Sequence, residues 1–189
     1  MSHAILKHLA DEVGEACELG VLAEGEVALI DQVQPDRALV LRFGRGERIP
    51  AHCTAIGKML LGSLPRRRRE RLIGNLPLKR YTDNTIIDAA ALASEVERAR
   101  TARVATASNE FLAGVVGVAV PVMGPQRRAC AALALVAPEA RLTLGQALEQ
   151  VPRLHEVAGR LSAALFTDRP DTRELGRDAE VDVKRHARA

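Results

Sequence analysis

His52 and Cys53 are neighbours whose types match the base and the thiol nucleophile of a hydrolase. Adjacent residues on an extended chain point to opposite sides, so the imidazole of His52 is badly placed to deprotonate the Cys53 thiol. The pair therefore favours a structural role, and a hydrolase that uses Cys53 stays as an alternative.

Gly57 and Lys58 form a pair that also occurs in phosphate-binding loops, but the leading glycine and the following Ser or Thr of such a loop are missing. The surrounding pattern instead predicts a helix capped by Thr54. Free amide N–H groups at such a helix start can hold a carboxylate or another polar ligand atom.

A basic run follows Pro65 and contains Arg66–Arg69 and Arg71. It has no aromatic neighbours, so it predicts a solvated helix face. A salt-dependent contact with DNA or with an acidic partner is the alternative.

The sequence predicts no metal site and no cofactor. The cysteines show no ligand spacing, and Glu95 and Glu97 alternate with arginines as on a solvated helix. We interpret Asn109 and Glu110 as loop residues. The histidines are scattered, at His3, His8, His52, His155 and His186.

The composition is that of one soluble globular domain: 189 residues, 47% hydrophobic and 27% charged. Aromatic residues make up only 2%, which argues against a surface that stacks nucleic-acid bases. A net charge of +3 is too small to indicate DNA binding by this chain alone. No membrane-spanning stretch and no signal peptide is visible, so we expect a cytoplasmic protein without membrane contact.

Hydrophobic periodicity predicts an α+β fold, in which an antiparallel-dominated sheet is flanked by helices. The 144–166 helix contains Pro152, which should kink it or delay its start. The charged tail 167–189 should be flexible. The expected helices are 4–16, one from Thr54, one from Pro65, one from Asp88 to about Arg103, and 144–166; the expected strands lie around Val21 and at 28–33, 38–43, 114–122 and 129–137.

Four segments in this order resemble the C-terminal effector-binding domain of the IclR family of bacterial transcriptional regulators. Each resembles a family motif, and the match covers about residues 5–166 in the order and at the spacings of the family. They are RIPAHCTAIGKMLLGSLP (48–65), TDNTIIDAAALASEVERAR (82–100), ASNEFLAGVVGVAVPV (107–122) and ACAALALVAPEAR (129–141).

The resemblance implies a GAF-like domain that senses a small metabolite and is not an enzyme. Residues 1–17 would end a linker and start the domain, and 18–166 would form the effector-binding domain. Family members carry a DNA-binding winged helix-turn-helix that nothing in this sequence resembles, so we expect DNA contact only through that missing part. Dimers or tetramers of the chain are expected. A stand-alone GAF- or PAS-type ligand-binding module is the alternative.

The resemblance also places an effector cavity on specific residues. Family members that bind small 2-oxo acids have an Asp, a Cys and two Ser where this chain has Ala107, Gly117, Ala134 and Val136. A small carboxylate would find few partners there, so we expect a mainly apolar or aromatic effector. Its polar end would meet the helix start, Ser108 or Asn109. The remaining expected lining residues are Leu41, Ile49, Ala55, Ile56 and Val115.

Overall fold

The computed structural model describes residues 2–35, 46–125 and 128–166. Its centre is an antiparallel sheet of six strands flanked by helices, which confirms the predicted α+β class. The strand order in the sheet is β3-β2-β1-β6-β5-β4. The strands are β1 (Ala16–Ala23), β2 (Glu26–Val33), β3 (Arg48–Pro50), β4 (Ala105–Ser108), β5 (Val115–Met123) and β6 (Ala129–Pro138).

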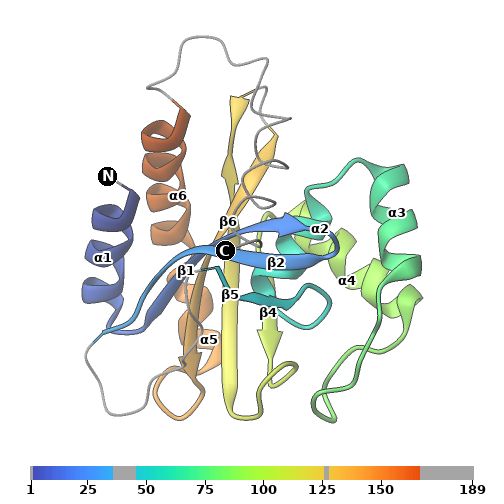
Figure 1. Ribbon diagram of the computed structural model, residues 1–189. Coiled ribbons are helices and arrows are strands. Elements are labelled where there is room, and N and C mark those ends of the chain that lie inside the picture. The colour runs from blue at the N-terminus through green and yellow to red at the C-terminus, as the bar shows by residue number, and fades with distance from the viewer. Residues whose placement is uncertain (1, 36–45, 126–127, 167–189) are drawn as a thin grey trace, which may run out of the picture.

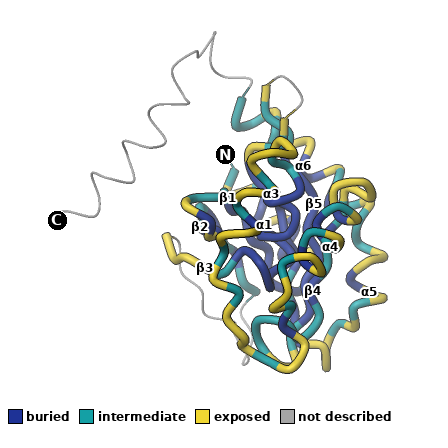
Figure 2. The backbone as a smooth tube through the Cα atoms, turned by 90° about the vertical axis from the view of Figure 1, so that its right-hand side faces the viewer, coloured by how far each residue is buried: buried dark blue, intermediate teal, exposed yellow. Residues whose placement is uncertain are grey.

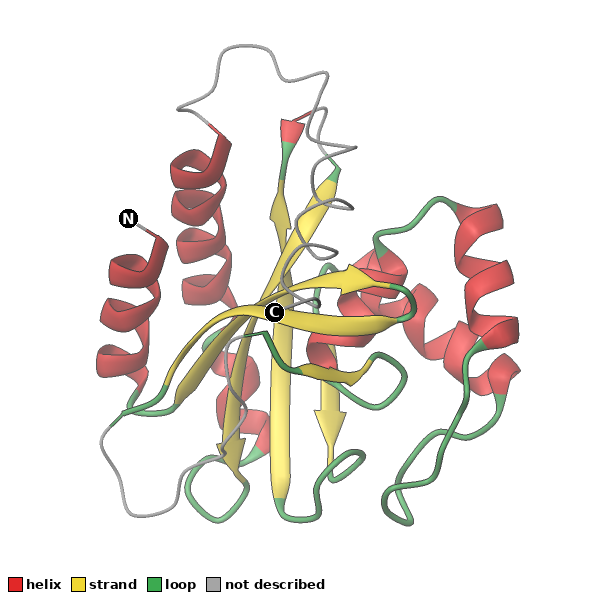
Figure 3. Ribbon diagram, in the orientation of Figure 1, coloured by secondary structure: helices red, strands yellow, loops and turns green. Residues whose placement is uncertain are grey.

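Helices cover both faces of the sheet (Figures 1 and 3). On one face, α1, α5 and α6 pack against the strands, and α1 also contacts α6. On the other face, α2 lies directly on β5 and β6, and α3 and α4 pack outside it. The helices are α1 (Ser2–Val13), α2 (Ala55–Gly62), α3 (Arg66–Asn75), α4 (Ala89–Ala102), α5 (Leu144–Glu149) and α6 (Val151–Phe166).

The central strands β5 and β6 are buried on both faces, and Figure 2 shows the dark tube of β5. Because no side of them meets water, their sequences are continuous apolar runs rather than alternating ones. Alanine, glycine and valine dominate these runs, so α2 can approach the sheet closely.

Two predicted boundaries need correction. The first helix ends at Val13 rather than at residue 16, because Gly14 has a φ of 71° and its N–H bonds to the carbonyl of Ala10. The second correction is a short strand that the sequence did not predict: Arg48–Pro50 pairs with β2. The predicted strand 38–43 and the tail 167–189 lie outside the described residues, and the predicted domain boundary after residue 17 falls within β1.

The predicted caps and the role of Pro152 are confirmed. The Thr54 hydroxyl accepts a hydrogen bond from the N–H of Gly57, and Asp88 caps α4 in the same way. The C-terminal helical region divides into α5 and α6, and Pro152 is the second residue of α6, where its missing N–H costs no helical bond. Within the described ranges, no helix is long and apolar enough to cross a membrane.

Gly57 of α2 packs tightly against the loop that precedes the helix. A Cβ atom there would lie 2.4 Å from both the Cα and the carbonyl oxygen of Ala51. We predict that Gly57→Ala lowers the free energy of unfolding by at least about 2 kcal/mol, because backbone must move to relieve the contact. Urea denaturation measures this loss.

Gly74→Ala is the matched control, since Gly74 is exposed on α3 and a Cβ there meets nothing within 4 Å. It should raise stability by up to about 1 kcal/mol through helix propensity. Equal stabilities for the two variants would contradict the close contact at Gly57.

Candidate functional site

A small cavity of about 50 Å3 lies between the start of α2, the sheet and the loop that joins β4 to β5. Apart from three polar residues, its wall is aliphatic or contributed by Cys53, Phe111 and Gly117. The polar residues are Glu18, Thr54 and Glu110. The other lining residues are Ile49, Ala55, Ile56, Ala107, Leu112, Val115, Val116, Ala134 and Val136.

The structure brings most of the predicted site residues together at this cavity. Ser108 and Asn109 do not line it: the Ser108 N–H lies 3.4 Å from Glu110 Oε1, and the Asn109 amide bonds to Ser108 and Glu139. Leu41 lies outside the described residues. The predicted residues that do line the cavity are Ile49, Ala55, Ile56, Ala107, Val115, Gly117, Ala134 and Val136.

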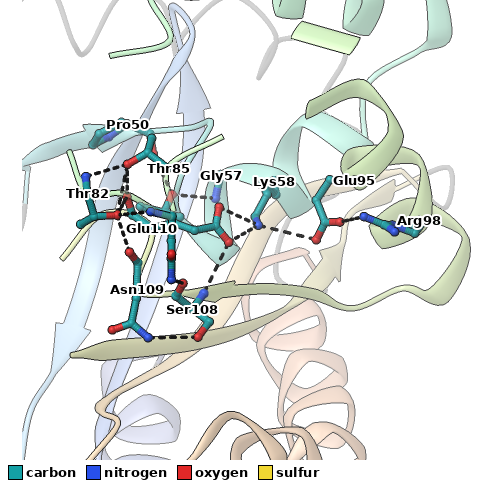
Figure 4. A network of polar contacts seen from close by, with 12 residues as sticks. Pro50, Gly57, Lys58, Thr82, Thr85, Glu95, Arg98, Ser108, Asn109 and Glu110 are labelled. Atoms are coloured by element: carbon teal, nitrogen blue, oxygen red, sulfur yellow. Dashed lines mark hydrogen bonds and ion pairs between the residues drawn. The ribbon is translucent and has the colours of Figure 1, made fainter. Parts of the chain in front are cut away.

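The loop that closes the cavity is fixed by two threonines from the segment before α4 (Figure 4). Thr85 is buried, and its hydroxyl donates to the carbonyl of Glu110 at 2.7 Å. The Thr82 hydroxyl donates to the carbonyl of Asn109 at 2.5 Å. These bonds position Glu110 and Phe111, whose ring packs edge-on against Tyr81 with centroids 4.9 Å apart.

Lys58 on α2 is the largest buried polar side chain near the cavity, with 1% of its side chain exposed. Its Nζ lies 2.8 Å from Glu110 Oε1, 3.1 Å from Oε2 and 3.7 Å from Glu95 Oε1 (Figure 4). Lys58 is therefore a partner for carboxylates within the fold, in agreement with the argument against a phosphate loop.

This network corrects two predictions. Glu110 is a wall residue with a buried ionic partner and not a plain loop residue, and Glu95 contacts Lys58 as well as Arg98, so it is not simply solvated. Lys58 and Glu110 are 52 residues apart in sequence, and no local spacing indicates their contact.

Glu18 is a second carboxyl group at the cavity, and the sequence analysis missed it. It is 2% exposed, and its Oε1 accepts a hydrogen bond of 3.0 Å from Gln32 Nε2. Burial raises the pKa of Glu18 to about 7, and the bond from Gln32 opposes that rise. The sequence does contain a signal for this residue, because Glu18 is the one charged residue in the otherwise apolar strand β1.

The arrangement of His52 and Cys53 does not support nucleophilic catalysis. His52 Nε2 lies 2.9 Å from the carbonyl oxygen of Lys79, so the imidazole is engaged away from the thiol. Burial raises the pKa of Cys53 to about 12, with the charge of Glu110 as a smaller cause. At neutral pH Cys53 is a thiol and a poor nucleophile.

The basic run forms an exposed helix face, as predicted, except at one position. Arg66, Arg67, Arg68 and Arg71 are exposed on α3. Arg69 turns inward, where its guanidinium lies 2.8 Å from Glu97 Oε2 and ties α3 to α4.

Comparison with known proteins identifies the family. The family model for the C-terminal domain of the bacterial transcriptional regulator IclR matches residues 1–163. The probable transcriptional regulator SauR of Cupriavidus necator is 42% identical over 156 residues, which are 82% of this chain and 62% of that protein. The chain belongs to the IclR family.

Two solved IclR-type domains share the fold. The inducer-binding domain of PobR from Acinetobacter, a double mutant in complex with 3-hydroxybenzoic acid, has a TM-score of 0.78 and 29% identity, and the match covers 86% of this chain and 95% of that one. An IclR homologue from Microbacterium hydrocarbonoxydans, in complex with 4-hydroxybenzoate, has a TM-score of 0.75 and 27% identity, with 85% and 64% covered.

This chain spans about half to two-thirds of the length of the curated IclR-family relatives it matches.

We predict that the Lys58–Glu110 contact behaves as a buried ion pair. Lys58→Met should cost about 3–5 kcal/mol of unfolding free energy, because it leaves the Glu110 carboxylate buried without its cation. The double variant Lys58→Met/Glu110→Gln should recover most of that loss, and urea denaturation of all three proteins measures the coupling.

The exposed pair Arg66–Glu70 is the matched control, with 82% and 56% of its side chains exposed. Arg66→Met should leave the free energy of unfolding almost unchanged, because water screens an exposed ion pair. A double variant no more stable than Lys58→Met would contradict the ion-pair assignment.

We predict a second, pH-dependent effect at Glu18. Because its pKa is higher in the folded protein than in an unfolded chain, the folded state binds the proton more tightly, so stability falls as pH rises from about 4.5 to about 7. Above this range, the ionised Glu18 lowers the free energy of unfolding by roughly 3 kcal/mol. Glu18→Gln should remove this part of the pH profile and be the more stable protein at pH 8. Identical profiles from pH 5 to 8 would refute the buried carboxyl.

Proposed function

We propose that this chain is the effector-sensing domain of an IclR-type transcriptional regulator. The observation that carries the proposal is the largely apolar cavity between α2 and the sheet, in a domain of a family of regulators. The cavity has no assembled nucleophile, so it is suited to binding a metabolite rather than to transforming it.

The effector class that fits is a mainly apolar or aromatic catabolite with one acidic end. Ala107, Gly117, Ala134 and Val136 present no polar side-chain atom to the cavity, so a small 2-oxo acid would leave its oxygens without partners. Two similar structures, an inducer-binding domain and an IclR homologue, are complexes with hydroxybenzoates, which supports an aromatic acid here.

The cavity must enlarge to admit such a molecule. Pockets for ligands of drug size run from roughly 300 to 1,000 Å3, and this one encloses about 50 Å3. The side chains of Phe111 and Leu112 are only half-buried and stand on the loop that closes the cavity, so they are the part of the wall that we expect to move. This movement gives the effector a means of favouring one arrangement of the domain.

We further propose that the regulator binds DNA through a part of the protein outside this chain, acts in the cytoplasm, and assembles as a dimer or tetramer. Bound effector would shift the population of domain arrangements and thereby change DNA affinity. Several of the relatives are named as helix-turn-helix regulators, which supports this arrangement.

A ligand screen tests the proposed function. Benzoate, 3-hydroxybenzoate and 4-hydroxybenzoate should raise the melting temperature of the purified chain, whereas glyoxylate and pyruvate should not. Ligand at about 100 times its dissociation constant adds roughly 2.7 kcal/mol to stability. Stabilisation by glyoxylate or pyruvate alone would refute the aromatic class.

Gly117→Ala shows whether the binding occurs in this cavity. A Cβ at Gly117 would lie 3.5 Å from the Cβ of Ala55, an ordinary contact, so the variant should fold normally while filling part of the cavity. Its affinity for the best acid of the screen should fall several-fold, whereas Gly74→Ala should bind as the parent chain does. Unchanged affinity in Gly117→Ala would place the binding elsewhere.

A further inference from the structure

We propose that Glu18 is the specificity-determining residue of the cavity, and that its carboxyl group donates a hydrogen bond to an anionic oxygen of the effector. This inference rests on the proposed function and names the group that recognises the acidic end of the effector. The preferred ligands are therefore carboxylic acids or other oxyanions with an apolar body.

The position of Glu18 in the sheet supports this role. In β1 it lies between Gln32 of β2 and Ala134 of β6, at the middle of the sheet, and it shares the cavity wall with Ala134. Gln32 satisfies Oε1, and among the described residues the structure shows no bond to Oε2. A carboxyl oxygen at the cavity wall that has no partner among the described residues gains a hydrogen bond when a ligand that can share a proton with it enters the cavity.

The charges around the cavity indicate which partner fits. From the loop, Glu110 faces the cavity but is held by Lys58, and the second contact of Lys58 is Glu95. Among the described lining residues there is no cation that could neutralise an effector carboxylate. An anion can then enter beside Glu18 only when that carboxyl carries a proton and donates it.

Protonation of Glu18 is accessible near neutral pH. Burial raises its pKa to about 7, with Gln32 as the partner that opposes the rise. Besides the Glu110 carboxylate, the titratable groups near it include two thiols that stay neutral. Burial, with Glu18 among the added causes, raises the pKa of Cys17, and burial raises the pKa of Cys53 to about 12. On the other side of β1, the residue of β6 that pairs with Glu18 is Ala134, which has no titratable group.

Proton uptake on binding follows from this chemistry. The protonated fraction of a group with a pKa near 7 falls about tenfold between pH 6 and pH 8, and the affinity for an anion should fall by the same factor. A cationic effector would show the opposite trend, since it would pair with ionised Glu18.

Isothermal titration of the chain with benzoate and with 3-hydroxybenzoate tests the proposal. We expect the dissociation constant of each acid to rise about tenfold from pH 6 to pH 8. At pH 7, titrations in buffers with different ionisation enthalpies should show net uptake of a fraction of a proton.

Two variants assign the effect to one residue. Glu18→Gln keeps a neutral donor, so it should bind at pH 6 about as well as the parent chain and lose both the pH dependence and the proton uptake. Glu70→Gln makes the same change at an exposed carboxyl on α3, outside the cavity, and should keep both. Circular dichroism confirms that each variant folds, and the proton uptake of the parent chain is informative without any variant.

Each result separates this inference from the proposed function. Binding that is independent of pH, that strengthens with rising pH, or that keeps its pH dependence in Glu18→Gln overturns the role of Glu18 and leaves the sensing function intact. No binding of either acid at any pH overturns both the role of Glu18 and the aromatic effector class.

Discussion

The buried contact between Lys58 and Glu110 is the constraint on which the cavity depends. An ammonium group that is 1% exposed has lost its water, so it requires a carboxylate within hydrogen-bond distance, and Glu110 supplies one at 2.8 Å. This requirement pulls the loop between β4 and β5 against α2. The same loop carries Phe111 and Leu112, so the ion pair fixes the backbone from which these two side chains reach the cavity wall.

The two faces of the sheet are packed differently, and this difference creates the hollow. Toward α1 and α6 the strands present larger side chains, such as Leu19, Leu133 and Leu135, which fill the space between helix and sheet. Toward α2 they present Gly117, Ala132 and Ala134. Small residues let α2 lie close to the sheet, as at Gly117 beside Ala55, and leave space beside the first turn of α2, where the cavity lies.

The sequence predicted the features that depend on local patterning. Thr54 and Asp88 cap their helices as expected, and the runs at 114–122 and 129–137 form the central antiparallel pair, because capping and burial act over a few neighbouring residues. Most of the predicted wall residues, from Ile49 to Val136, do line the cavity. They could be predicted because the family resemblance covers the segments that carry them.

The sequence could not reveal contacts that depend on the folded path of the chain. The sequence indicates a loop residue at Glu110 and a solvated one at Glu95, because their common partner Lys58 is far away in sequence. The predicted first helix is too long because Ala16 continues its apolar periodicity. In the structure Gly14 ends the helix through its positive φ, which periodicity does not detect. Ser108 and Asn109 were assigned to the cavity although their polar groups hold the loop instead.

Glu18 links the energetics of the domain to its proposed recognition of an acid. A carboxyl group at the centre of an apolar sheet is destabilising whenever it ionises, since desolvation penalises the charge. Serine would provide a donor without that penalty, but it would also provide the donor at every pH. A carboxyl makes the cavity neutral or anionic according to its proton, so the presence of an anionic effector and the protonation of Glu18 stabilise each other. Binding and folding therefore draw on the same proton equilibrium, and a change at Glu18 must affect both.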